Sequence, residues 1–205
     1  GLADAFRTTG VMRFGHDPAR PVTVGWPYLV DELVEFVHAQ PFHAGRTWLV
    51  GHSLGGYLSL LAAARLPGRV DGVVLLDSPL ITGVTAAAIR IGRVTGLDRL
   101  LMPLSQTLQR RQHWPDAEAA HAHFAAKRAF QRWDPRALRD YAEHCTVPDG
   151  RGGRELLFDR SVEFRIYRSL PTHRVAATAG QLEVPIAFIG ARSSRELRHI
   201  GDRAT

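Results

Sequence analysis

The pattern of apolar and polar positions predicts strands that alternate with helices near both ends of the chain. Short apolar runs bounded by glycine or proline predict buried strands at 47–51 and 72–76, and 185–190 has the same strand signature. The stretch 7–14, RTTGVMRF, is rich in β-forming residues and predicts a further strand. Strands that alternate with helices are typical of an α/β domain with a mostly parallel sheet.

Two helices are predicted beside these strands. One begins near Trp26-Pro27, because proline suits a first helical turn and apolar residues then recur at helical spacing. Its other face carries Asp31, Glu32 and Glu35 and is predicted to be solvated. The second is an alanine- and leucine-rich run that ends near Leu66, before Pro67-Gly68.

The middle of the chain, from 83 to about 180, shows helical patterns and is predicted to contain no strands. The expected helices lie within 115–130, 134–145 and 159–170, with a turn-forming segment at 148–153. The last residues, 192–205, are predicted to form a polar helix or a loop.

Ser53 is the strongest candidate for chemistry, because it stands in GHSLGG where a predicted strand gives way to a helix. We expect Gly51 and Gly55 to be required there, since side chains would collide in so tight a turn. The turn exposes the Ser53 hydroxyl and directs the backbone N–H of Leu54 at an oxyanion beside it. The alternative is a serine that only caps a helix.

GHSLGG, together with the following LLDSP at 75–79, resembles the serine-nucleophile branch of the α/β-hydrolase superfamily. The resemblance implies the α/β-hydrolase fold, a mostly parallel sheet with helices on both faces and an inserted helical cap. The core would then comprise 1–82 and 183–205, and the cap 83–182. It also implies a triad of serine, acid and histidine, with no metal ion and no cofactor.

The resemblance also suggests the acid of the triad. In the family the acid most often ends the seventh strand, but after Gly190 no carboxylate comes before Glu196. A variant of the family places it after the sixth strand, and Asp77, 24 residues beyond Ser53, fits that position. The alternative is a carboxylate that only accepts hydrogen bonds from backbone N–H groups at Ser78 and beyond.

The histidine of the triad is not apparent. In the family it follows an eighth strand, yet only 15 residues follow Gly190. His52 adjoins the nucleophile but points elsewhere, and His16 lies in a loop at the correct sheet edge, so both are pocket candidates only. We therefore expect an incomplete chain that lacks the N-terminal strands and the C-terminal histidine segment.

These features predict a serine hydrolase, resembling an esterase, that cleaves a small ester or related acyl substrate through an acyl-enzyme. A second interpretation is a catalytically inactive binding module on the same scaffold, if no histidine follows residue 205. Flanking sequence would distinguish the two.

Composition and charge argue against two classes of partner, nucleic acid and membrane. The net charge is +6, and the excess lies within 83–182, where 16 basic residues stand against 10 acidic ones. Only one of the 26 basic residues is a lysine and no nucleic-acid motif accompanies them, so nucleic acid is not an expected partner. No apolar run nears the roughly 18 residues of a membrane span. Together with the single cysteine, Cys145, this predicts a cytoplasmic protein.

Overall fold

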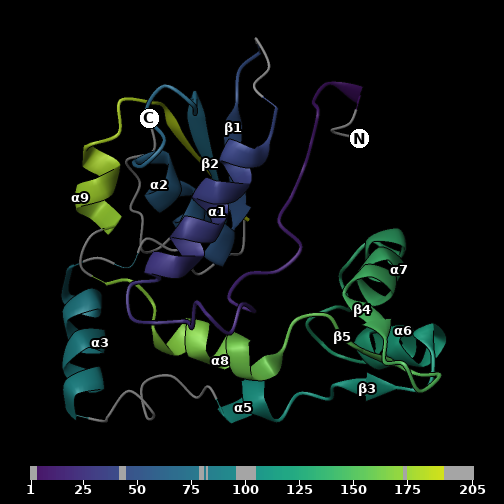
Figure 1. Ribbon diagram of the computed structural model, residues 1–205. Helices are drawn as coiled ribbons and strands as arrows, with labels where there is room; N and C mark the ends of the chain where they lie inside the picture. The colour runs from purple at the N-terminus through teal and green to yellow at the C-terminus, as the bar shows by residue number, and fades with distance from the viewer. Residues whose placement is uncertain are drawn as a thin grey trace. The chain divides into compact units, whose positions relative to one another are not determined.

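The computed structural model describes residues 4–41, 45–78, 81, 83–95, 105–172 and 175–191 (Figure 1). The chain divides into two compact units. The first comprises Gly1–Met102 and Arg168–Thr205, and the second comprises Pro103–Tyr167.

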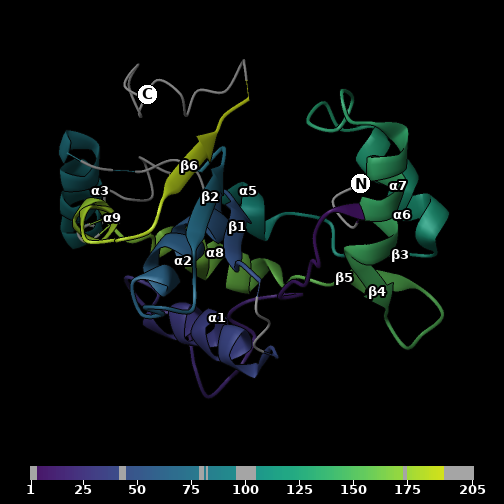
Figure 2. The same cartoon turned by 90° about the horizontal axis from the view of Figure 1, so that it is seen from above.

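A three-stranded parallel sheet forms the centre of the first unit. Its strands are β1 (Trp48–His52), β2 (Gly72–Leu76) and β6 (Ile186–Ile189), in the order β1-β2-β6 (Figure 2). All three were predicted from their apolar runs. The register pairs His52 with Leu76, so β1 and β2 end level with each other at the same edge of the sheet.

Helix α2 (Leu54–Ala63) covers one face of this sheet, and α1 (Pro27–Ala39) packs against α2 (Figure 2). The side chains of Leu49, Val73 and Leu75 are buried in the sheet. The alternate positions of β1 are exposed. Helix α9 (Val175–Gly180) also contacts α2, and α3 (Gly83–Thr95) follows β2 in the chain.

The strand predicted at residues 7–14 is wrong, because the structure has no strand there. β-forming residues supply only a weak preference, and a strand forms where a neighbour completes its hydrogen-bond ladder. None of the described strands pairs with this segment. The segment therefore forms a connection without regular secondary structure before α1.

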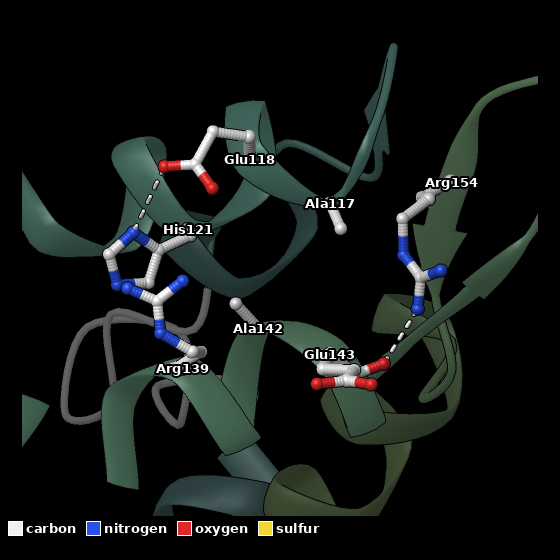
Figure 3. A pocket seen from close by; sticks show the side chains of 7 residues that line it. All are labelled: Ala117, Glu118, His121, Arg139, Ala142, Glu143 and Arg154. Carbon is white, nitrogen blue, oxygen red and sulfur yellow. Dashed lines mark hydrogen bonds and ion pairs between the residues drawn. The ribbon is translucent and has the colours of Figure 1, made fainter. Parts of the chain in front are cut away.

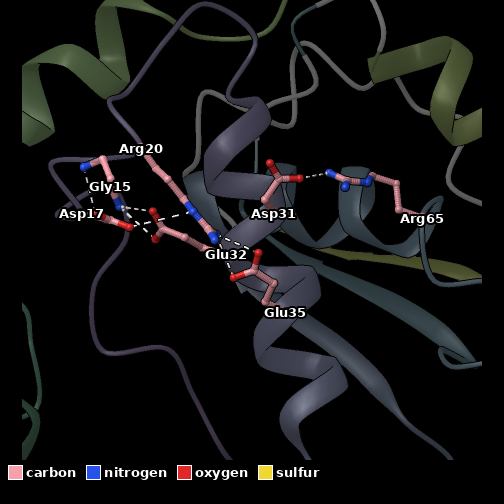
Figure 4. Close-up of polar contacts among 8 residues, drawn as sticks. Gly15, Asp17, Arg20, Asp31, Glu32, Glu35 and Arg65 are labelled. Carbon is pink, nitrogen blue, oxygen red and sulfur yellow. Dashed lines mark hydrogen bonds and ion pairs between the residues drawn. The ribbon is translucent and has the colours of Figure 1, made fainter.

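The acidic face of α1 is more than a solvated surface. Glu32 is half-buried, and both its carboxylate oxygens accept the backbone N–H of Gly15, at 3.1 and 3.0 Å (Figure 4). Arg20 pairs with Glu35 at 2.7 Å, and Arg65 pairs with Asp31 at 2.6 Å. These contacts tie the loop before α1, and the end of α2, to α1.

Short helices and a small sheet make up the second unit. The helices are α5 (Ser105–Leu108), α6 (Ala117–Ala125), α7 (Pro135–His144) and α8 (Arg160–Arg168), the last ending just beyond the unit's boundary. The strands β3 (His113–Trp114), β4 (Thr146–Pro148) and β5 (Arg154–Leu156) form an antiparallel sheet in the order β3-β5-β4. The prediction of a region without strands is therefore wrong.

The predicted turn at 148–153 explains this sheet. The Asp149 carboxylate accepts backbone N–H groups of Arg151 and Gly153, at 2.8 and 2.9 Å. Gly150 and Gly152 have φ of 74° and 91°, a region that favours glycine. The turn thus closes a hairpin, because Val147 and Pro148 can pair with residues after it.

Helix α7 begins as predicted, with the Asp134 carboxylate accepting the N–H of Arg136 at 2.8 Å. Its apolar stripe meets α6 in a core with buried Trp114, Phe124, Leu138 and Ala142. The interpretation of 83–182 as a cap stays a prediction. No helix in the described parts of the chain is long and apolar enough to cross a membrane.

Candidate active site

Ser53 lies at the turn between β1 and α2. Its φ of 50° and ψ of −114° lie in a region that residues other than glycine rarely adopt, at a cost of about 1–3 kcal/mol. Although Ser53 occupies the N-cap position, its side chain makes no capping hydrogen bond. The alternative of a serine that only caps the helix is therefore wrong, and the hydroxyl does not serve the helix.

Close packing of β1 against the first turn of α2 explains part of the glycine pattern. A Cβ on Gly51 would overlap the backbone of Gly55 and Gly56, which confirms that Gly51 is required. A Cβ on Gly55 would meet no described atom within 4 Å, so Gly55 is not required for steric reasons. Gly56 is required in its place, because a Cβ there would overlap the side chain of Ser78.

The end of β2 holds the backbone of Ser53 on both sides. The Ser53 N–H donates to the carbonyl of Leu76 at 3.1 Å. The Ser53 carbonyl accepts the hydroxyl of Ser78 at 2.6 Å and the N–H of Gly56 at 3.1 Å. Strained conformations persist where the surroundings determine them in this way.

Asp77 directly follows the residue of β2 that pairs with His52, so it and Ser53 continue adjacent strands at one sheet edge. It is half-buried and has a φ of 45°. Its N–H donates to Ile189 at 2.8 Å, and its carboxylate accepts the N–H of Ala191 at 3.4 Å. That partner is a backbone N–H that follows β6, so the alternative of a carboxylate that only accepts backbone N–H groups stays open, and the role of Asp77 as the acid stays a prediction.

Leu54 is the first residue of α2 and is half-buried. Its N–H has no acceptor within the helix, because helical hydrogen bonds run four residues back along the chain. It lies next to the Ser53 hydroxyl in sequence, at the positive end of the helix dipole. Its role as an oxyanion donor remains a prediction.

The structure places the two pocket candidates differently. His52 ends β1 with an exposed side chain, on the opposite side of the strand from Gly51, which faces α2. His16 is half-buried, and its Nδ1 lies 2.8 Å from the carbonyl of Phe14. A carbonyl only accepts, so Nδ1 carries the hydrogen in this contact.

Sequence reasoning missed Ser78, Gly56 and Tyr57. Ser78 is completely buried, and Tyr57, also buried, accepts the N–H of Ile81 through its hydroxyl at 2.7 Å. Ser78 and Gly56 had a visible signal, since a serine directly after the candidate acid and a second glycine after Ser53 suggest close packing. Tyr57 gave no signal, because it stands in an apolar helical run whose pattern indicates only core packing.

A hollow of about 210 Å³ lies in the second unit, apart from these residues (Figure 3). Glu118 lies 3.9 Å from His121 at its rim, and Arg154 donates to the carbonyl of Glu143 at 2.6 Å. Its lining carries two arginines, two glutamates and one histidine, so neither sign of charge dominates. Among the described residues, no group of three or more His, Cys, Asp or Glu side chains could hold a metal ion.

The sequence profile of the α/β hydrolase fold family matches residues 12–153. Among curated proteins, none matches the chain. A peroxisomal α/β-hydrolase from Saccharomyces cerevisiae has a similar structure, with a TM-score of 0.54 and 10% identity, over 87% of this chain and 58% of that one.

Two further solved structures are similar. A hypothetical protein from Pseudomonas aeruginosa gives a TM-score of 0.53 and 22% identity, over 82% of this chain and 58% of that one. A thioesterase domain from the curacin biosynthetic pathway gives 0.51 and 20%, over 78% of this chain and 53% of that domain. The chain thus spans little more than half of each, and identities this low establish a shared fold alone.

Proposed function

We propose that this chain, which belongs to the α/β-hydrolase fold family, is a serine hydrolase that cleaves a small ester or related acyl compound through an acyl-enzyme. The observation that carries the proposal is the strained backbone of Ser53 at the end of β1. Asp77 continues the adjacent strand at the same edge, where ligands bind in open α/β sheets.

In the first half of the reaction, the Ser53 oxygen attacks the carbonyl carbon while its proton passes to a histidine base. The N–H of Leu54 donates to the oxyanion of the tetrahedral intermediate. The carbon–oxygen bond to the alcohol then breaks as the histidine returns its proton to that oxygen. The acyl group is left on Ser53.

In the second half, water attacks the acyl carbonyl and gives a proton to the same histidine. The bond to Ser53 breaks, Ser53 regains its proton, and the carboxylic acid leaves. Asp77 holds the imidazole in the correct tautomer and stabilises its charged form. Binding and proton transfer in this scheme require no metal ion.

The proposal assigns the base to a histidine outside the described residues. His52 is turned away from the helix side of the sheet, and the Nδ1 of His16 is engaged with the Phe14 carbonyl. A base must come within hydrogen-bond reach of the proton it removes.

The test is labelling of the full-length protein with a fluorophosphonate probe, together with hydrolysis of p-nitrophenyl acetate. We expect labelling and turnover in the wild type, and loss of both in Ser53→Ala. Ser59→Ala is the matched control, because Ser59 is a buried serine on the same helix. It should keep both activities.

Two outcomes would contradict the proposal. Labelling that survives Ser53→Ala would show that another residue is the nucleophile. A folded full-length protein that neither reacts with the probe nor turns over the ester would favour the second interpretation, a non-catalytic binding module.

A further inference from the structure

Ser78 has an unusual position for a serine. Its side chain is completely buried, and its hydroxyl donates to the carbonyl oxygen of Ser53 at 2.6 Å. A buried hydroxyl that satisfies a backbone carbonyl is ordinary, but this carbonyl belongs to the candidate nucleophile. The contact also joins two segments that are 25 residues apart in sequence.

The surrounding chain leaves little room for another side chain at this place. A Cβ on Gly56 would lie 2.6 Å from the Cβ of Ser78 and closer still to its oxygen. Because Gly56 has no side chain, α2 leaves room for Ser78 next to the turn at Ser53. Gly56 and Ser78 thus form one close contact between α2 and the end of β2.

The hydrogen bond from the Ser78 hydroxyl is accepted by the peptide group between Ser53 and Leu54. That group is planar and trans, so its C=O and N–H point in opposite directions. A donor that fixes the Ser53 oxygen therefore also fixes the direction of the Leu54 N–H. A hydrogen bond accepted by the carbonyl further polarises the amide and strengthens its N–H as a donor.

Asp77 lies between the two residues that hold Ser53. Leu76 accepts the N–H of Ser53 on one side, and Ser78 donates to its carbonyl on the other. One three-residue segment therefore sets the orientation of the nucleophile's backbone and carries the candidate acid.

From this geometry we infer that Ser78 is a positioning residue, which aims the Leu54 N–H at the oxyanion through its hydrogen bond to the Ser53 carbonyl. The inference rests on the proposed serine hydrolase activity. Since an oxyanion donor acts mainly in the transition state, loss of its orientation lowers kcat and leaves KM nearly unchanged.

The test compares Ser78→Ala with wild type in the full-length protein. Complete removal of an oxyanion donor costs roughly 100–1000-fold in kcat, and a donor that is retained but misdirected should cost about 10-fold. We expect that loss in kcat, KM within about twofold, and binding of an aryl boronic acid, which forms a tetrahedral adduct, weakened about 10-fold.

Thr146→Val is the matched control for a structural role. Thr146 is as deeply buried and its hydroxyl donates to the carbonyl of Ala142 at 2.7 Å, in the second unit. Both variants lose a buried hydroxyl that donates to a backbone carbonyl, and Thr146→Val also removes the acceptor of the Arg154 Nε–H at 2.7 Å, so it should lower Tm at least as much as Ser78→Ala. Only Ser78→Ala should lower kcat and weaken the binding of the boronic acid.

The outcomes separate this inference from the proposed function. A wild type without esterase activity or probe labelling refutes the proposed function. An active wild type whose Ser78→Ala variant keeps kcat within twofold overturns the inference alone. If Ser78→Ala does not fold, Ser78→Cys replaces it, since a thiol is a weaker donor of similar shape. An unchanged kcat in that variant also overturns the inference.

Discussion

Gly51 of β1 lies directly against the carbonyl group of Gly55 in α2, so a methyl group on Gly51 would overlap backbone atoms. Such overlap cannot be relieved by a change of rotamer, because both partners are main chain. Strand and helix therefore meet more closely than any side chain allows, and Ser53 turns the chain between them.

The two glycines should respond in opposite ways to the same substitution. We expect Gly51→Ala to lower the free energy of unfolding by about 3 kcal/mol, through overpacking against backbone. Gly55→Ala should raise it by up to about 1 kcal/mol, because alanine favours a helix and meets no described atom. Urea unfolding of both variants is the measurement. Equal effects would contradict the packing described.

Asp77 allows its chemical and conformational roles to be separated. Asparagine tolerates a positive φ, so Asp77→Asn should fold normally. It should lower kcat about 10⁴-fold, as expected when a histidine loses its orienting carboxylate. Asp77→Ala should also lose about 1 kcal/mol of stability. Esterase kinetics and thermal unfolding test this, and a fully active Asp77→Asn would remove Asp77 from the triad.

Tyr57 connects α2 with the segment after β2. Its buried hydroxyl accepts the N–H of Ile81 at 2.7 Å, and its ring meets Trp26 edge-on with centroids 5.9 Å apart. Tyr57→Phe keeps the ring and removes the acceptor, so we expect a loss of about 1–2 kcal/mol. Hydrogen exchange at Ile81 should accelerate as well. Unchanged exchange there would show that the bond does not hold this segment.

Glu32 should make stability depend on pH. Burial raises the pKa of its carboxyl group above the ordinary value, while the hydrogen bond from Gly15 opposes this. A raised pKa means that the folded state holds the proton more tightly. The favourable contribution is therefore present below the unfolded pKa, near 4.3, and is lost as pH rises through the folded pKa.

Glu32→Gln tests this pH dependence, since the amide oxygen still accepts the Gly15 N–H. We expect the stability of the wild type relative to Glu32→Gln to fall as the pH rises above the unfolded pKa of about 4.3, and to level off once the pH exceeds the raised pKa of the folded state. Glu35→Gln, on the same helix, is the comparison: it removes one charge and the exposed ion pair with Arg20, but leaves the contact of Glu32 with Gly15 in place. A difference that stays constant with pH, or that grows, would contradict the assignment.

The strands that the sequence predicted correctly are short apolar runs between turn residues, and the structure buries them to different degrees. β2 lies between the other two strands and is largely buried, as an unbroken apolar run predicts, whereas alternate positions of β1 and most of β6 are exposed. The hairpin of β4 and β5 was missed because its strands are three residues long, too short for a periodic signal. Residues 7–14 carried a strand composition without a pairing partner among the described strands.

The candidate site also combines features that the sequence predicted with features that only the structure shows. Glycines around a serine identified the turn before any coordinates, but the tertiary contacts assigned the steric requirement to Gly51 and Gly56 rather than to Gly55. Likewise, the acidic face of α1 looked solvated until the loop at Gly15 was found bonded to Glu32.

The sequence by itself determined that a serine stands at a strand-to-helix turn in an α/β domain, because local composition and spacing encode strands, helices and turns. Only the tertiary structure decided that Leu76 and Ser78 hold the Ser53 backbone around Asp77. Those bonds join residues more than 20 positions apart, and their partners are brought together by strand register and side-chain packing, which a linear pattern does not contain.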